Sequence, residues 1–345
     1  MAYLKQIFNQ KQVEDSFFRP LGAGVSMFIT LLFAVVLDDT KIATIGIMGA
    51  FSYLYFQYTS MYQNFIYIAC HGISLYLSFS IGIYAGGHPG SIPFLISIIA
   101  FFCFLTTKLA NVPKPDYFFI LMLFATGTNL ANVGHILPTS NYLLYGICAS
   151  LISGCIISLL LKLPIKKLNK DKPLISLKDK YYIMIYKDPD IILKTIHFSS
   201  VIFCSSYVAT LFNEQNGYWI LITSVAILGG EKIDEIRIRS QQRMIGSIIG
   251  LILGIILINL NLSQLAIYLL IVILNICVVF FVPRNYAIAN FFTNPQILLL
   301  SSLNSTNVNL SLIPYRLFST IIGISIVVLL MLLFDYGLSI SKKNY

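Results

Sequence analysis

The chain has 345 residues, of which 57% are hydrophobic and 11% charged, with 23 Lys and Arg against 14 Asp and Glu. Soluble domains contain roughly half apolar and a quarter charged residues, so this composition excludes an ordinary soluble protein. We expect an all-α integral membrane protein, because a helix satisfies its own backbone hydrogen bonds in lipid.

Twelve apolar segments follow one another along the chain, and about 20 helical residues are needed to cross a ~30 Å hydrocarbon core. The first six cover residues 20–37, 42–56, 65–85, 92–109, 117–131 and 142–163. The other six cover residues 195–212, 218–230, 243–259, 264–282, 286–302 and 314–334. We therefore predict about twelve transmembrane helices.

The second and fifth segments of each set of six are shorter or more polar than their neighbours. Paired short segments are typical of a transporter's binding region, because a broken helix can direct its terminus at a ligand. Helices whose true ends differ from these segment boundaries, or helices that tilt less, would explain the pattern equally well.

The second set of segments repeats the first, since the corresponding starts differ by 169 to 178 residues. Six is an even number, so the two halves enter the membrane in the same direction and form parallel six-helix repeats. The predicted division is a first repeat at 1–163, a basic cytoplasmic linker at 164–194 and a second repeat at 195–345. The linker carries eight lysines and has room for one amphipathic helix.

The distribution of Lys and Arg along the chain predicts the orientation of the protein in the membrane. With the N and C termini both cytoplasmic, 21 of the 23 Lys and Arg face the cytoplasm, and only Lys41 and Arg316 lie outside. The positive-inside rule favours this arrangement in the cell (cytoplasmic) membrane. The basic balance then reflects topology and contact with anionic membrane lipids, and nucleic acid is not an expected partner.

No pattern in the chain indicates an enzyme, a cofactor or a metal. The six cysteines all lie in apolar segments without a CxxC or a His/Cys ligand spacing, so we expect small buried side chains. No GxxxxGK[ST] motif occurs, and no catalytic cluster emerges.

The most specific stretch runs from Gly217 to Gly254 and reads GYWILITSVAILGG, EKIDEIRIRSQQ and RMIGSIIGLILG. With the later Tyr286 and Thr293, and then Arg316, Thr320 and Gly323, it resembles the fusaric acid resistance protein-like family and its aromatic acid exporter relatives. The resemblance implies a membrane efflux transporter of small organic anions, with aromatic carboxylates among its substrates. The first half departs from this pattern, because His71 is its nearest equivalent of Arg243.

The candidate substrate-binding residues follow from this resemblance and from the cost of charge in a membrane. A guanidinium persists in a span when it lines a wet pathway or extends to the headgroups, and its planar fork fits a carboxylate. We expect Arg243 near the cytoplasmic end of its helix and Arg316 near the outer end of the last helix. The other candidates are Tyr218, Trp219, Tyr286, Thr293 and His71; interfacial anchoring is the alternative role of Tyr218 and Trp219.

Small residues recur every four positions on the third segment of each half and predict close helix packing. We expect the two third segments to pack against each other. The residues are Gly246, Gly250 and Gly254, with Ser74, Ser78 and Gly82 in the first half.

Two other functions stay open at this point. One is a passive anion channel, because plant malate channels are related to this family. The other is a non-transporting scaffold in envelope assembly, with the lysine-rich linker binding a cytoplasmic partner. The substrate, the energy source and a homo-oligomeric state are not predicted by the sequence.

Overall fold

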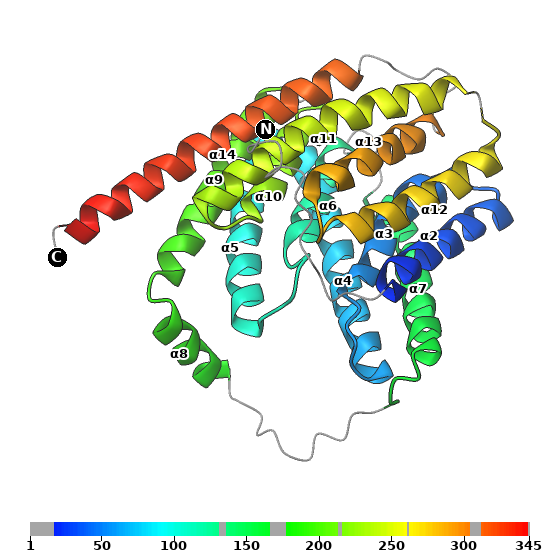
Figure 1. The fold of residues 1–345 in the computed structure, drawn as a ribbon, viewed down its shortest axis with the longest axis horizontal. Helices are drawn as coiled ribbons and strands as arrows, with labels where there is room; N and C mark the ends of the chain where they lie inside the picture. Colours follow the sequence, from blue (N-terminus) through cyan, green and yellow to red (C-terminus); the bar gives the residue numbers. More distant parts are fainter. Residues whose placement is uncertain are drawn as a thin grey trace. The chain divides into compact units, whose positions relative to one another are not determined.

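A computed structural model describes residues 17–130, 136–165, 177–212, 216–260, 262–303 and 312–343 (Figure 1). All regular elements in these ranges are helices. The predicted N-terminal arm with Lys5 and Lys11, and residues 166–176 of the predicted linker, lie outside them. The linker helix is present as α8, Leu177–Lys187.

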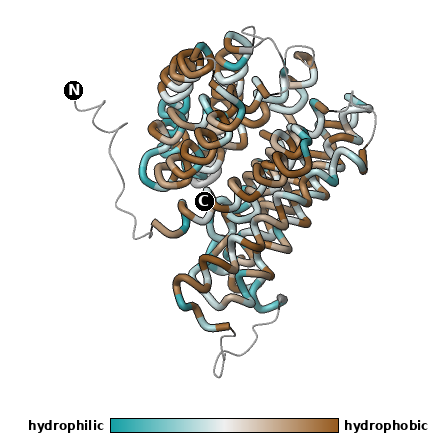
Figure 2. The backbone as a smooth tube through the Cα atoms, turned by 90° about the vertical axis from the view of Figure 1, so that its right-hand side faces the viewer, coloured by the Kyte–Doolittle hydropathy of each residue, from teal (hydrophilic) through white to brown (hydrophobic). Residues whose placement is uncertain are grey.

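Eight helices in the described ranges are long and apolar enough to cross a membrane. Figure 2 shows hydrophobic residues along most of their turns. Large apolar side chains stay exposed on them, including Phe94, Leu159 and Leu265, as expected for a multi-pass protein whose solvent is lipid. The eight are α2 (Phe18–Val36), α4 (Met61–Gly86), α5 (Ile92–Ala110), α7 (Ile136–Leu160), α9 (Ile191–Leu211), α11 (Ile233–Asn259), α12 (Gln264–Phe281) and α14 (Leu312–Lys343).

The segments predicted to be short are short helices in the structure. The second segment of the first half is broken into η1 (Ile42–Gly46), α3 (Ile47–Ala50) and η2 (Phe51–Tyr55). The other three are α6 (Phe118–Asn129), α10 (Tyr218–Leu228) and α13 (Tyr286–Ser302). Pro295 lies inside α13, where it cannot donate a backbone hydrogen bond to the preceding turn.

The helices form two compact units, and each unit draws on both halves of the sequence. The first contains Met1–Leu77, His135–Lys166 and Ile238–Leu317, and the second contains Ser78–Gly134, Lys167–Arg237 and Phe318–Tyr345. In the first unit α2 packs against α7 and α12, and α12 packs against α13. In the second, α5 packs against α9 and α6, and α10 packs against α9 and α6.

Both units therefore pair the same segments of the two halves of the sequence. The first segment of one half packs on the fourth segment of the other, as α2 on α12 and as α9 on α5. The second segment of one half likewise contacts the fifth of the other, as η1 with α13 and as α10 with α6. The division of the chain at residues 163 and 195 stays a prediction.

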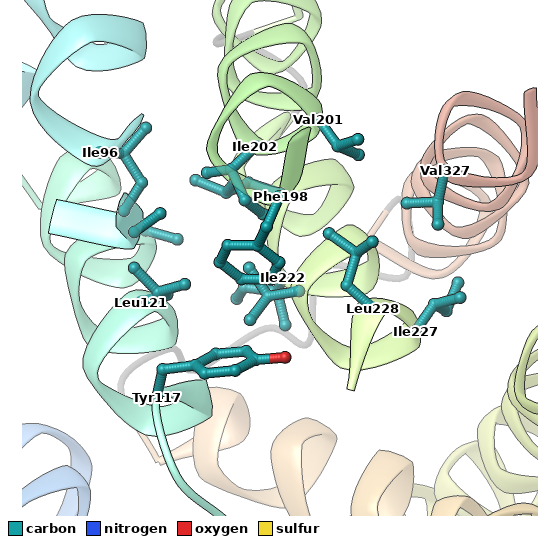
Figure 3. Packing of buried hydrophobic residues seen from close by; sticks show 14 of the residues in the cluster. Ile96, Tyr117, Leu121, Phe198, Val201, Ile202, Ile222, Ile227, Leu228 and Val327 are labelled. Atoms are coloured by element: carbon teal, nitrogen blue, oxygen red, sulfur yellow. The ribbon is translucent and has the colours of Figure 1, made fainter. Parts of the chain in front are cut away.

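The core of the second unit is built from apolar side chains of α5, α6, α9 and α10 (Figure 3). The ring of Phe198 on α9 packs against those of Phe104 and Tyr117, with centroids 4.8 Å and 4.7 Å away. Aromatic packing at these distances adds about 0.5–1.5 kcal/mol per pair to the burial of the rings.

The small-residue stripes bring helices of one half close together. On α11, a Cβ added at Gly250 would lie 2.5 Å from the Asn290 carbonyl oxygen of α13, and one at Gly246 would lie 2.7 Å from the Ala287 oxygen. Gly254 faces Pro295 and Leu298 in the same way. In the described contacts the third helix therefore packs on the fifth helix of its own half.

The first half shows the same arrangement between α4 and α6. The Ser78 hydroxyl donates to the Ile120 carbonyl oxygen at 2.6 Å, and Gly82 faces the backbone of Phe124. Ser74 differs, because its hydroxyl donates to Cys70 on its own helix at 3.0 Å. The expected packing of the two third helices against each other stays a prediction.

Candidate functional site

Two buried amide side chains on successive turns of α13 form the centre of the candidate site. Asn290 is 2% exposed and Asn294 is 3% exposed. The Asn290 amide donates to the Tyr286 carbonyl at 2.8 Å, and the Asn294 amide donates to the Asn290 carbonyl at 3.1 Å. These bonds orient both side-chain oxygens as acceptors on successive turns of one helix.

Arg243 of α11 contacts the first of these turns. Its side chain is 8% exposed, and Nη1 donates to the Tyr286 hydroxyl at 3.0 Å and to the Asn290 Oδ1 at 3.0 Å. The glycine stripe next to it on α11 holds the two helices close enough for this contact. Both acceptors are neutral, so they orient the guanidinium without compensating its charge.

The Nε edge of this guanidinium has a buried hydrogen-bond donor that is not satisfied within the described residues. The ion pairs found in those residues also do not include Arg243. The Nε–Nη2 edge donates two parallel hydrogen bonds, which is the geometry that a carboxylate accepts.

Arg316 of α14 contacts the next turn of α13. It is 7% exposed, and its Nη2 donates to the Asn294 Oδ1 at 2.8 Å. One turn of helix rises about 5.4 Å, so the two arginines reach neighbouring turns. Arg316 lies in the first turns of α14, whereas α11 begins at Ile233, ten residues before Arg243. The positions of the two arginines relative to the membrane stay a prediction.

The part of the chain that carries both arginines matches a known protein family. The family model described as fusaric acid resistance protein-like matches residues 203–330. This segment is similar to that family. It includes α10 to α13, the Arg243 and Arg316 side chains, and the motifs that carry the resemblance.

The chain is also similar to an uncharacterized protein of Haemophilus influenzae (strain ATCC 51907 / DSM 11121 / KW20 / Rd). The two are 30% identical over 131 residues, which are 38% of this chain and 18% of the relative. This chain therefore matches less than a fifth of that protein's length. No solved structure matches the chain.

The fusaric acid resistance protein-like segment contains two site residues that sequence reasoning missed, Asn290 and Asn294. Their spacing of four within a predicted span was the available signal, because it places two amides on one helix face. Arg239 adds a third cation, with its guanidinium 5.3 Å from the centroid of the Tyr286 ring. Tyr286 thus contacts two arginines of α11.

Other predicted residues have different contacts. Thr293, also in the family segment, donates its hydroxyl to the Ala289 carbonyl of its own helix at 2.9 Å. The His71 ring stacks on Tyr55 with centroids 3.7 Å apart, and its Nδ1 lies 2.7 Å from the Tyr67 oxygen. These contacts are enough to explain His71 as a packed core residue.

Tyr218 and Trp219 begin α10 and belong to the second compact unit, whereas Arg243 and Arg316 belong to the first. Their rings lie 5.1 Å apart and pack against the core of the second unit. Their role as substrate contacts stays a prediction.

A cluster of charged residues lies in the loops of the second unit. Lys108 pairs with Glu231 at 2.6 Å, Lys114 donates to the Gly229 carbonyl, and Asp116 Oδ1 accepts from the Tyr117 amide at 2.8 Å. Burial raises the pKa of Asp116, and the nearby Lys114 charge opposes that shift. No group of three or more His, Cys, Asp or Glu in the described ranges could hold a metal ion.

Proposed function

We propose that this protein is a transporter of the cell membrane that moves small organic carboxylates, including aromatic ones, out of the cytoplasm. The observation that carries the proposal is the buried, unsatisfied Nε of Arg243, a residue whose hydrogen-bond acceptors are both neutral. A buried guanidinium without an acid costs from about 3 kcal/mol upward in a membrane, and a carboxylate ligand offsets that cost.

Arg316 and the amides of α13 extend this site. Arg316 is held by Asn294 at 2.8 Å, one turn from the contact of Arg243 with Asn290. The substrate carboxylate would bind to Arg243, and the positive charge of Arg316 would attract the same anion. The Tyr286 hydroxyl accepts from Arg243 and keeps its own proton to donate to the ligand.

The proposed layout is twelve spans in two parallel repeats with both termini cytoplasmic. The eight long helices and the short elements at 42–55, α6, α10 and α13 supply the twelve. Helix α2 packs on α12, and α9 packs on α5 in the same way. The recurrence of this pairing supports the repeat. The site is asymmetric because the first half carries apolar Leu121 and Ala125 at the positions that correspond to Asn290 and Asn294.

Reconstitution in liposomes tests this function. Purified protein should give saturable flux of benzoate and of acetate, and none of neutral benzamide. Arg243→Lys keeps the charge but loses the planar fork, so the KM should rise about tenfold, which corresponds to one charged hydrogen bond of about 1.5 kcal/mol. Arg316→Ala should abolish most of the flux.

Arg284→Gln is the matched control, because Arg284 donates to the Phe280 carbonyl of its own helix at 2.7 Å and lies outside the site. It should leave the KM unchanged. Wild-type flux in Arg316→Ala would remove the proposed role of that residue. Non-saturating, voltage-driven current would identify an anion channel instead, and absence of carboxylate flux in the wild type would refute transport of this substrate class.

A further inference from the structure

The short helix α8 presents an aromatic and basic face that the core of its unit does not cover. Tyr182 is 60% exposed, Tyr186 is 90% exposed and Ile183 is 44% exposed. The opposite side of the helix is anchored, because Met184 and Ile185 pack against the core of the second unit. The exposed face is therefore a fixed surface of the folded protein.

The position of α8 along the chain places this face at the membrane surface. α8 ends at Lys187, and the membrane-spanning α9 begins at Ile191 (Figure 1). Four residue steps span at most about 14 Å when fully extended. Lys194 of α9 pairs with both carboxylate oxygens of Asp188 at 2.7–2.8 Å, which fixes the turn between the two helices.

The charges of α8 complement an anionic surface. The helix contains Lys178, Lys180 and Lys187 against one acid, Asp179, and all four are exposed. At 100° per residue, Tyr182 and Tyr186 form one stripe bordered by Lys178 and Asp179, and Lys180 and Lys187 lie about 140–160° around the helix from Tyr182. Exposed tyrosines on a helix with net positive charge are typical of helices that lie in the membrane interface, where long lysine side chains reach the headgroups.

We infer that α8 binds the anionic phospholipid surface of the membrane from which α9 begins. Tyr182 and Tyr186 insert between the headgroups, and the three lysines contact lipid phosphates. This lipid contact is independent of the proposed carboxylate site, because α8 and Arg243 belong to different compact units. It would make the stability of the protein depend on phosphatidylglycerol.

The test measures thermal stability of the full-length protein in detergent micelles at increasing phosphatidylglycerol or phosphatidylcholine. A lipid that binds the folded state raises the apparent Tm in proportion to the logarithm of its concentration over Kd. Removing each lysine should raise the half-saturating phosphatidylglycerol concentration about fivefold. Lys178→Gln, Lys180→Gln and Lys187→Gln combined should remove the preference for phosphatidylglycerol over phosphatidylcholine.

The control removes the same charge elsewhere, with Lys232→Gln, Lys342→Gln and Lys343→Gln combined, and should keep the preference. An equal loss in the control, or no loss in the α8 variant, overturns the inference. If the triple variant is unstable in phosphatidylcholine, Lys180→Gln and Lys187→Gln are measured singly, and each should still show the fivefold change.

A photoreactive benzoylphenylalanine at position 186 identifies what covers the face. In vesicles containing phosphatidylglycerol it should crosslink to lipid. A crosslink to another protein in native membranes, or no lipid crosslink in vesicles, shows that α8 binds something other than the bilayer and overturns the inference.

Discussion

Gly250→Ala tests the close contact between α11 and α13 on which the arginine site depends. The added Cβ would lie 2.5 Å from the Asn290 carbonyl oxygen and 3.0 Å from the Asn294 Cβ. Ordinary contact starts at 3.4 Å, so the two helices must separate by about 1 Å at a point where backbone meets backbone. Overpacking of this kind costs about 1–3 kcal/mol.

The change is measured as the free energy of unfolding in detergent, and carboxylate flux is measured in parallel. We expect Gly250→Ala to lower both, because Asn290 and Asn294 hold Arg243 and Arg316. Gly337→Ala on α14 is the matched control, since an added Cβ there meets nothing within 4 Å. The control should be neutral or stabilising by up to about 1 kcal/mol through helix propensity. Equal stability of the two variants would refute the packing argument.

The remaining predictions concern single contacts. Asn294→Leu removes an acceptor of the buried Arg316, so the free energy of unfolding should fall by about 1–3 kcal/mol; a Leu variant as stable as wild type would contradict this. His71→Phe keeps the stack on Tyr55 and should preserve carboxylate flux, whereas lost flux in a folded variant would restore His71 to the site. Burial raises the pKa of Asp116, so the folded state holds that proton to higher pH than the unfolded chain, and the resulting stability is lost as pH rises through the folded pKa. Asp116→Asn should therefore be more stable than wild type at neutral pH, with a difference that shrinks toward pH 4 in thermal unfolding; a difference that is independent of pH would oppose this interpretation.

The sequence predicts the membrane-spanning helices, the short elements and the family of the second half, because these depend on apolar length and local motifs. It places the start of α11 too late, since the charged stretch 231–242 has the composition of a turn between two spans. Glu, Arg and Gln are nevertheless good helix formers, and α11 continues through most of that stretch from Ile233. The arginine therefore lies inside a helix rather than at its end.

The partners of the arginines are harder to predict. Asn290 and Asn294 carry no charge and disturb the apolar pattern of α13 only slightly. Their importance comes from the contact with α11 and α14, which depends on how helices pack rather than on local periodicity. The pairing of α2 with α12 likewise joins segments that no short-range signal connects.

That pairing has a consequence for biogenesis. Residues of α2 are synthesised long before their packing partner α12, which begins only at Gln264. Until α12 has been synthesised, α2 must remain in lipid without this neighbour, and such non-local contacts slow folding. Neither half, expressed alone, would hold all the helices that either compact unit requires, so productive assembly should need both halves in one membrane.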